Sequence, residues 1–357
     1  MKKVIIICNT YYQLIAAIQI KLTIKKNEHV SVIISDHSNN AYLVYKRLLN
    51  EHVFNDLYFV KTKKVCEDQA FFLKSVKGAK EAICGRGSIF DFLPRNEKYD
   101  EFLFYNYDIA THCLFAHIER YNSNVDVSKY EEGILSYNMD EVCFKKIYAI
   151  REKMGHGNLY PSVRKFYCFY PDLYSGRLEA IGIPLIASES NKLKKIVENI
   201  FSINTQTLIY KQKYIYFSGV YDFEGGESIN ELKFIQKLAE LVGIENLLIK
   251  AHPRDNVQRF EEIGVQVDKM SEAPWEAVFL NYDFSDKVFL TIISGSVINL
   301  NLMYRCSPKT FLLYKLFGDK NNNSMTRCIK MFENIYKTGK INNCEVIRDL
   351  DEILKYE

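Results

Sequence analysis

The sequence predicts an α/β protein with two Rossmann-like doubly wound domains that face a cleft, and two observations predict it. Short β-branched runs alternate with longer helical patterns, which is typical of βαβ units in a parallel sheet with helices on both faces. The same alternation restarts late in the chain, after an irregular stretch. A chain of 357 residues is also long enough for two cores of ordinary size.

In the first half, the strand–helix order is regular. The buried run "KVIIICN" predicts a strand at 3–9, and the pattern after it predicts a helix at 11–26. Further runs predict strands at 29–36, 56–62 and 101–108, with helices at 41–52 and 109–121 and a short strand at 126–130.

In the second half, apolar runs predict strands at 213–219, 246–253, 287–296 and 309–317, the last of them the final strand. Helices are expected at 229–243 and 297–305. We therefore expect an N-terminal Rossmann-like domain at 1–170, an inter-domain crossing at 171–210, and a C-terminal Rossmann-like domain at 211–357.

Composition excludes several classes of protein. The chain is 48% hydrophobic and 25% charged, with a net charge of +3, which is the composition of a folded protein and gives no footprint for nucleic acid. Nine scattered cysteines, never spaced C-x-x-C, favour a reducing cytoplasm over a disulfide framework. No run reaches the ~18 apolar residues of a membrane span, although contact with a membrane surface stays open.

Ligands of open α/β sheets bind beyond the carboxyl ends of the strands, so the residues that follow strands are the candidates. Asn9, Thr10 and Gln13 follow the first strand. Ser218 and Gly219 follow the strand at 213–219, and Lys250 comes at the end of the next one. All six are expected to contact substrate.

The stretch "YEEGILSY" places Glu131 and Glu132 before Gly133. Glycine permits a tight turn, and partial burial raises the pKa of a carboxyl group toward the range of a general base. A solvated acidic turn is the alternative. Either glutamate is a candidate base, with a slight preference for Glu131.

The stretch "LLIKAHPRD" ends a strand in His252 and Pro253. A residue before proline is confined to extended backbone conformations, which fixes the direction of the imidazole. An imidazolium directed at a phosphate stabilises or protonates a departing nucleotide. An ordinary loop histidine is the alternative.

Two further motifs suit a nucleotide. Ser294, Gly295 and Ser296 lead a strand into a helix, and a helix N-terminus favours phosphate; plain capping by serine is the alternative. Glu276, in the first turn of a short helix that Pro274 opens, is a candidate for the ribose hydroxyls. No D-x-D pair lies between strands, which argues against a metal-dependent sugar-nucleotide site.

In this order the motifs resemble those of bacterial sialyltransferases, most closely the lipooligosaccharide type (glycosyltransferase family 52), with the polysialyltransferases more distant. The shared features are Glu131-Glu132-Gly133, His252-Pro253 and the serine-rich stretch 294–296. Many relatives have two adjacent hydroxyl residues at the last motif, whereas this chain has Val297 after Ser296. The resemblance implies a glycosyltransferase-B fold, with the acceptor and general base on the domain at 1–170 and the CMP-sugar on the domain at 211–357. The reaction it implies is inverting, metal-independent transfer from CMP-sialic acid to a galactose-terminated surface glycan, lipooligosaccharide or capsule. It also implies a base among the glutamates, His252 as the acid, no cofactor, and a homodimer as one possible state.

Three alternatives remain. One is a transferase of the same family that uses another sugar nucleotide. Another is a UDP-sugar 2-epimerase on the same fold, and the third is a non-catalytic glycan- or nucleotide-binding protein.

Overall fold

The computed structural model describes residues 1–138, 144–187, 190–204, 210–219, 229–252, 255–268, 273–304, 308–317, 323–339 and 343–356. The chain divides into two compact units, each built on its own sheet. Unit 1 comprises Met1–Glu132, Ser136–Pro184 and Lys195–Ile200, and unit 2 comprises Gly133–Leu135, Leu185–Lys194 and Phe201–Glu357.

Unit 1 contains a sheet of seven parallel strands in the order β3-β2-β1-β4-β5-β6-β7. The central strand β1 is buried along most of its length, as a parallel strand covered by helices on both faces requires. The strands are β1 (Lys3–Cys8), β2 (His29–Ser35), β3 (Asp56–Val60), β4 (Glu101–Phe104), β5 (Asp126–Tyr130), β6 (Val163–Cys168) and β7 (Glu179–Gly182).

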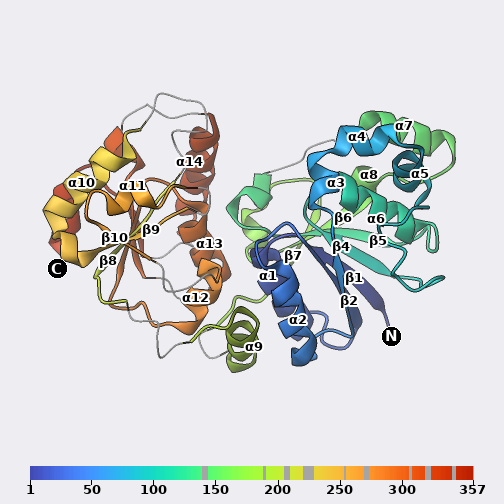
Figure 1. The fold of residues 1–357 in the computed structure, drawn as a ribbon, viewed down its shortest axis with the longest axis horizontal. Helices are drawn as coiled ribbons and strands as arrows, with labels where there is room; N and C mark the ends of the chain where they lie inside the picture. The colour runs from blue at the N-terminus through green and yellow to red at the C-terminus, as the bar shows by residue number, and fades with distance from the viewer. Residues whose placement is uncertain are drawn as a thin grey trace. The chain divides into compact units, whose positions relative to one another are not determined.

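The strand order reverses between β1 and β4, and the helices change face at that point. Helices α1 and α2 lie along one face of the sheet, while α3 to α6 cover the other (Figure 1). The helices of unit 1 are α1 (Tyr11–Leu22), α2 (Ala41–Glu51), α3 (Lys63–Glu67), α4 (Gln69–Lys74), α5 (Val76–Cys84), α6 (Ile109–Glu119), α7 (Lys145–Lys153) and α8 (Leu159–Ser162), with the 3₁₀ turn η2 (Pro171–Leu173). The residues of the 3₁₀ turn η1 (Ile134–Asn138) and of helix α9 (Asn191–Phe201) are divided between the two units.

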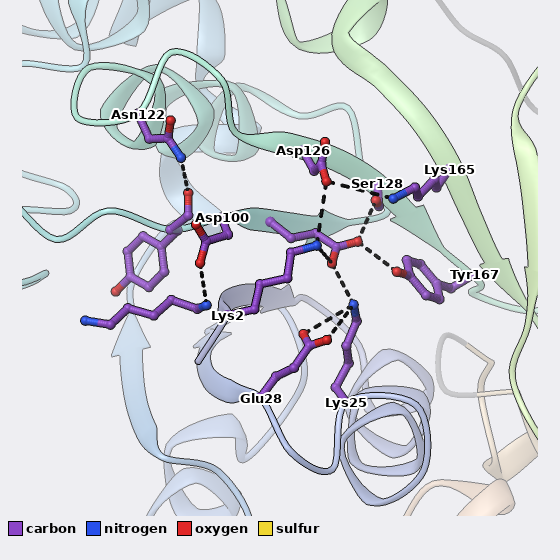
Figure 2. A network of polar contacts seen from close by, with 12 residues as sticks. Lys2, Lys25, Glu28, Asp100, Asn122, Asp126, Ser128, Lys165 and Tyr167 are labelled. Carbon is purple, nitrogen blue, oxygen red and sulfur yellow. Dashed lines mark hydrogen bonds and ion pairs between the residues drawn. The ribbon is translucent and has the colours of Figure 1, made fainter.

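The amino edge of the unit 1 sheet holds a buried ion cluster (Figure 2). The carboxylate of Glu101, with no exposed surface, receives the ammonium of Lys25 at 2.7 Å and that of Lys2 at 3.4 Å. Its other oxygen accepts from Ser128 Oγ at 3.0 Å and from the Tyr167 hydroxyl at 2.8 Å. The hydrogen bonds offset the cost of burying this charge, so the cluster has a structural explanation.

Unit 2 repeats the plan with a six-stranded parallel sheet in the order β10-β9-β8-β11-β12-β13. Its order reverses between β8 and β11, the counterparts of β1 and β4. The strands are β8 (Tyr214–Phe217), β9 (Leu247–Lys250), β10 (Gln266–Val267), β11 (Val288–Thr291), β12 (Lys309–Leu312) and β13 (Cys344–Val346).

The helices of unit 2 also cover both faces. Helices α10 and α11 lie on one side of the sheet, and α12, α13 and α14 on the other (Figure 1). Their bounds are α10 (Glu231–Val242), α11 (Gln258–Glu261), α12 (Trp275–Asn281), α13 (Gly295–Met303) and α14 (Asn323–Tyr336), with 3₁₀ turns η3 (Ile244–Asn246), η4 (Tyr314–Phe317) and η5 (Leu350–Tyr356). Trp275 is buried against Phe217, Phe284 and Phe289, so the single tryptophan is a core residue.

Several expected elements differ from the structure. The strands expected at 246–253 and 287–296 end at Lys250 and Thr291, so His252 and Ser294 lie beyond them. The run at 101–108 stops pairing at Phe104, and Asp108 caps α6 instead. The run at 309–317 is strand only to Leu312, turns into η4, and is followed by β13, so it is not the final strand. The expected crossing at 171–210 contains β7, an ordered member of the first sheet, and α9.

Candidate active site

The carboxyl ends of β1 and β4 meet at the reversal point of the unit 1 sheet, where ligands of this kind of fold bind. The Asn9 side-chain amide donates to Asp108 Oδ2 at 3.0 Å, which joins the two strand ends. Asp108 is itself fixed, because its Oδ1 accepts the Thr111 backbone N–H at 2.7 Å as the N-cap of α6. The polar residues at this edge therefore form an ordered group.

The three candidates after β1 belong to this group. Gln13 Oε1 accepts the Asn9 backbone N–H at 2.7 Å, and its Nε2 donates to Asn106 Oδ1 at 2.8 Å. Thr10 caps α1 by accepting the Gln13 N–H at 3.3 Å. Asn9, Thr10 and Gln13 thus have structural contacts of their own, and their contact with substrate stays a prediction.

Glu131 follows β5 and is completely enclosed. Oε1 accepts the Tyr12 hydroxyl at 2.7 Å, while Oε2 accepts the Tyr137 hydroxyl at 2.6 Å and the Phe169 backbone N–H at 2.8 Å. Burial raises the pKa of Glu131, and these three hydrogen bonds oppose the rise. A carboxylate with both oxygens committed inside the protein is poorly suited to accept a proton from a substrate.

Glu132 has a different environment, since its side chain is partly exposed. Its backbone N–H donates to Ser136 Oγ at 2.7 Å, which closes the turn, and Gly133 follows with φ +86°. That φ lies in the left-handed region and explains the glycine. Burial and, to a smaller extent, the charge of Glu132 raise the pKa of the Cys8 thiol to about 12, and the hydrogen bond from Tyr130 opposes the rise.

In unit 2, the structure brings Ser218 and His252 together. The Ser218 side-chain oxygen accepts the His252 backbone N–H at 2.9 Å, and the Ser218 backbone N–H donates to the Lys250 carbonyl at 3.0 Å. The Gly219 N–H donates to Glu231 Oε1 at 2.9 Å. Pro253 lies outside the described residues.

Lys250 and Glu276 lie at the same edge of the unit 2 sheet. The Lys250 ammonium binds Asp268 Oδ2 at 3.0 Å and sits 5.5 Å from the Trp275 ring centroid. Glu276 is in the first turn of α12. Burial raises its pKa, and the charge of Lys250 opposes the rise.

Ser294, Gly295 and Ser296 form the N-terminus of α13, next to the reversal point between β8 and β11. The Ser294 side chain makes no capping hydrogen bond, and both serines are partly exposed. A Cβ added to Gly295 would meet no atom within 4 Å. This open helix terminus has the properties expected of a phosphate site.

Several residues of these networks escaped the sequence analysis. They are Tyr12, Asp108, Tyr137, Glu231, Asp255 and Arg259. Only Asp255 had a local signal, since it is the next acidic residue after His252-Pro253 in the sequence. Tyr12 and Asp108 are 119 and 99 positions from their partners Glu131 and Asn9, and single-sequence patterns do not report such contacts. Tyr137 and Arg259 are only six and four positions from Glu131 and Asp255, but no motif indicated them.

Across the described ranges, we find no group of three or more His, Cys, Asp and Glu side chains arranged to hold a metal ion. Within those same ranges, every helix is too short or too polar to cross a bilayer.

A model of the alpha-2,8-polysialyltransferase (POLYST) family matches residues 4–313, which is most of the chain and spans both sheets. The chain belongs to the alpha-2,8-polysialyltransferase family. Membership makes it a glycosyltransferase that transfers sialic acid. A comparison with curated protein sequences gives no match.

This finding corrects the sequence analysis, which placed the lipooligosaccharide-type sialyltransferases first and the polysialyltransferases as more distant relatives. The polysialyltransferase match spans residues 4–313. The resemblance rested on short motifs at 131–133, 252–253 and 294–296, which it ascribed to both groups. Such motifs do not separate the two families, whereas a match over most of the chain does.

One solved structure supports the fold. An alpha/beta-galactoside alpha-2,3-sialyltransferase from Photobacterium phosphoreum has a TM-score of 0.50 at 11% identity, covering 96% of this chain and 97% of its own. Two others are less similar. A sialyltransferase from Photobacterium damsela has a TM-score of 0.47 at 11% identity (97% and 81% covered), and MurG from Acinetobacter baumannii has a TM-score of 0.47 at 11% identity (100% and 90% covered). The polysialyltransferase chain has the predicted glycosyltransferase-B fold, with two Rossmann-like sheets.

Proposed function

We propose that this enzyme transfers sialic acid from CMP-sialic acid to the terminal sialic acid of a glycan and forms an α-2,8 linkage. The observation that carries the proposal is the match of the alpha-2,8-polysialyltransferase family over residues 4–313. The proposal includes an inverting mechanism without a metal ion. Loss of one phosphate with CMP has less need of a metal clamp than loss of a diphosphate.

Glu132 is the proposed general base. In a single displacement, the acceptor oxygen bonds to the anomeric carbon while the bond from that carbon to the phosphate oxygen breaks. The acceptor proton passes to Glu132, and the bonding electron pair leaves with CMP. The partial exposure of Glu132 supports the role, whereas Glu131, with its three internal donors, is better explained as a structural residue.

Unit 2 supplies the proposed groups for the leaving nucleotide. His252 stabilises or protonates the CMP phosphate as charge develops on it. The open N-terminus of α13, with Ser294 and Ser296, binds that phosphate. Glu276 is the proposed partner of the ribose hydroxyls.

Family membership changes the acceptor that we expect. The resemblance implied a glycan that ends in galactose, but an α-2,8 linkage joins sialic acid to sialic acid. We therefore place sialylated glycans before galactosides as acceptors. A cytoplasmic location, contact with a membrane surface and a homodimer stay predictions.

The test is release of CMP from CMP-sialic acid in EDTA, with lactose, with sialyllactose and with no acceptor, for wild type and His252→Ala. We expect release that depends on sialyllactose, survives EDTA and falls about 100-fold or more in the variant. Elongation of sialyllactose by several residues would support polymer synthesis.

Other outcomes redirect the proposal. Release that depends on lactose would restore the galactoside acceptor. Release that stops in EDTA would contradict the metal-independent mechanism. If no CMP is released under any condition, the donor assignment fails, and UDP-sugars tested with and without acceptor separate another transferase from an epimerase.

A further inference from the structure

The main chain of His252 is held in a closed ring of hydrogen bonds. Its N–H donates to Ser218 Oγ at 2.9 Å, and its carbonyl accepts the Asp255 N–H at 2.8 Å. The Ser218 hydroxyl donates in turn to Asp255 Oδ2 at 3.0 Å. Ser218 thus acts as acceptor and donor in the same ring, and its hydrogen is directed at Asp255.

Asp255 is itself fixed from the other side. Arg259 Nη2 binds Asp255 Oδ2 at 2.7 Å and Glu231 Oε2 at 2.7 Å. The side chains of Asp255 and Glu231 are only 3% and 1% exposed. Glu231 also accepts the Gly219 N–H and the Tyr216 hydroxyl, both at 2.9 Å. This arrangement connects the segment after β8 to the segment after β9.

The ring of hydrogen bonds fixes a residue that the sheet does not hold in place. Strand β9 ends at Lys250, so the sheet ladder does not hold His252, which lies in a connecting segment. Connecting segments are more mobile than the strands they follow, and a misplacement of about 1 Å in a reacting group lowers the rate about 100-fold. An acid group in this segment therefore requires a separate support.

We propose that Asp255 and Ser218 are positioning residues for the sialyl transfer reaction, which fix the main chain of His252 so that its imidazole meets the leaving phosphate. The inference rests on the proposed function, because the role of His252 is proposed there. It also reassigns Ser218, which the sequence analysis expected to contact substrate.

The test compares three single variants, Ser218→Ala, Asp255→Asn and His252→Ala. It also compares two double variants, in which Ser218→Ala or Asp255→Asn is combined with His252→Ala. We expect each positioning variant to lower kcat about tenfold, with the KM for CMP-sialic acid within about twofold of wild type. In the His252→Ala background, neither variant should lower kcat further, because residues that act as one unit have non-additive effects.

Thr291→Val is the matched control. The Thr291 hydroxyl is buried and donates to the Phe217 carbonyl at 3.0 Å, one residue before Ser218. We expect it to lower thermal stability as Ser218→Ala does and to keep the wild-type kcat. Melting curves identify any variant that fails to fold, and Ser218→Ala removes no charge and so tests the ring if Asp255→Asn does not fold.

Three results would overturn the inference. Losses that multiply with that of His252→Ala would indicate a general structural effect, and a raised donor KM at constant kcat would indicate direct contact of Ser218 with the donor. An inactive His252→Ala beside fully active Ser218→Ala and Asp255→Asn would refute the positioning role alone. Absence of CMP release from the wild type would instead refute the proposed function.

Discussion

The Tyr12 hydroxyl lies 2.7 Å from Glu131 Oε1, and this hydrogen bond joins the first turn of α1 to the end of β5. With Tyr137 on the other oxygen at 2.6 Å, it closes the carboxylate off from solvent. The neighbouring Glu132 is partly exposed. Two adjacent glutamates of one turn thus have different environments, as the buried Asp255 and the partly exposed His252 do in unit 2.

The two glutamates should respond differently to the same substitution. We expect Glu132→Gln to lower kcat about 100-fold or more with little change in stability, because it removes the proposed base. Glu131→Gln should lower the free energy of unfolding by about 1–3 kcal/mol, because an amide has one acceptor oxygen where three donors need two. Rates and urea denaturation of the two variants check this.

Tyr12→Phe is the companion variant to Glu131→Gln, since it leaves Glu131 Oε1 without its donor. It should destabilise the protein by a similar amount, whereas Tyr42→Phe, at a residue 54% exposed, should stay within about 0.5 kcal/mol of wild type. Equal losses of kcat in Glu131→Gln and Glu132→Gln would contradict the assignment of the base.

The sequence predicted the elements whose signal is local. The buried run at 3–9 and the amphipathic pattern at 229–243 correspond to β1 and α10 within a few residues. Strands β6, β7, β10 and β13 were missed. Strands β7, β10 and β13 are four residues or shorter, and Arg164 and Lys165 interrupt the apolar run of β6. Such strands are defined by pairing with a neighbour, and pairing leaves no periodicity in so short a segment.

For the candidate site, the sequence predicted where the motifs lie but not the environment of each side chain. The motifs at 131–133 and 294–296 lie directly beyond strands, where the α/β rule placed them. The difference between Glu131 and Glu132 was not predictable, because it depends on Tyr12, 119 positions away in the sequence. The support of His252 by Ser218 depends in the same way on a contact across 34 positions.

Gly295→Ala should weaken donor binding without affecting the fold. An added Cβ meets no protein atom within 4 Å, so the free enzyme has room for it. At the N-terminus of α13, the same methyl group occupies space in front of the backbone N–H groups proposed to bind phosphate. We expect the Kd for CMP to rise about tenfold, measured by calorimetry, with an unchanged melting temperature.

Cytidine, which lacks the phosphate, is the internal control for that variant. Its affinity should be the same for wild type and Gly295→Ala. A parallel loss of cytidine and CMP binding would move the phosphate away from this helix terminus.

Glu231 should make stability fall as pH rises. Burial raises its pKa to about 7, so between about pH 4.5 and 7 the folded protein binds a proton that the unfolded chain has lost. The free energy of unfolding therefore decreases across this window, by on the order of 3 kcal/mol for a shift of this size. Denaturation at pH 5 and pH 8 should show a smaller decrease for Glu231→Gln. Glu240→Gln, at an exposed position of the same helix, should behave as wild type.

Glu101, at the amino edge of the unit 1 sheet, should have the opposite effect: its contribution to stability should be lost as the pH falls. Burial raises the pKa of Glu101, but the hydrogen bond and charge of Lys25 outweigh it, and the pKa stays below its usual value. The stabilisation by this carboxylate is therefore present above about pH 4.5 and is lost as pH falls through the folded pKa. We expect Lys25→Met to lower the free energy of unfolding by about 3–5 kcal/mol at pH 7, because it leaves a buried carboxylate with less compensation.

The pH dependence of that loss separates charge from packing. Because removal of the Lys25 ammonium favours protonation of Glu101 as the pH falls, the loss of stability at pH 4 should be clearly smaller than at pH 7. Lys26→Met, at the exposed neighbouring position, should change stability by no more than about 0.5 kcal/mol at either pH. Because Lys25 and Glu101 lie at the amino edge, opposite the strand ends that carry Glu132, folded Lys25→Met should keep the wild-type kcat. A loss of equal size at both pH values would show that the aliphatic stem of Lys25, and not its charge, stabilises this edge of the sheet.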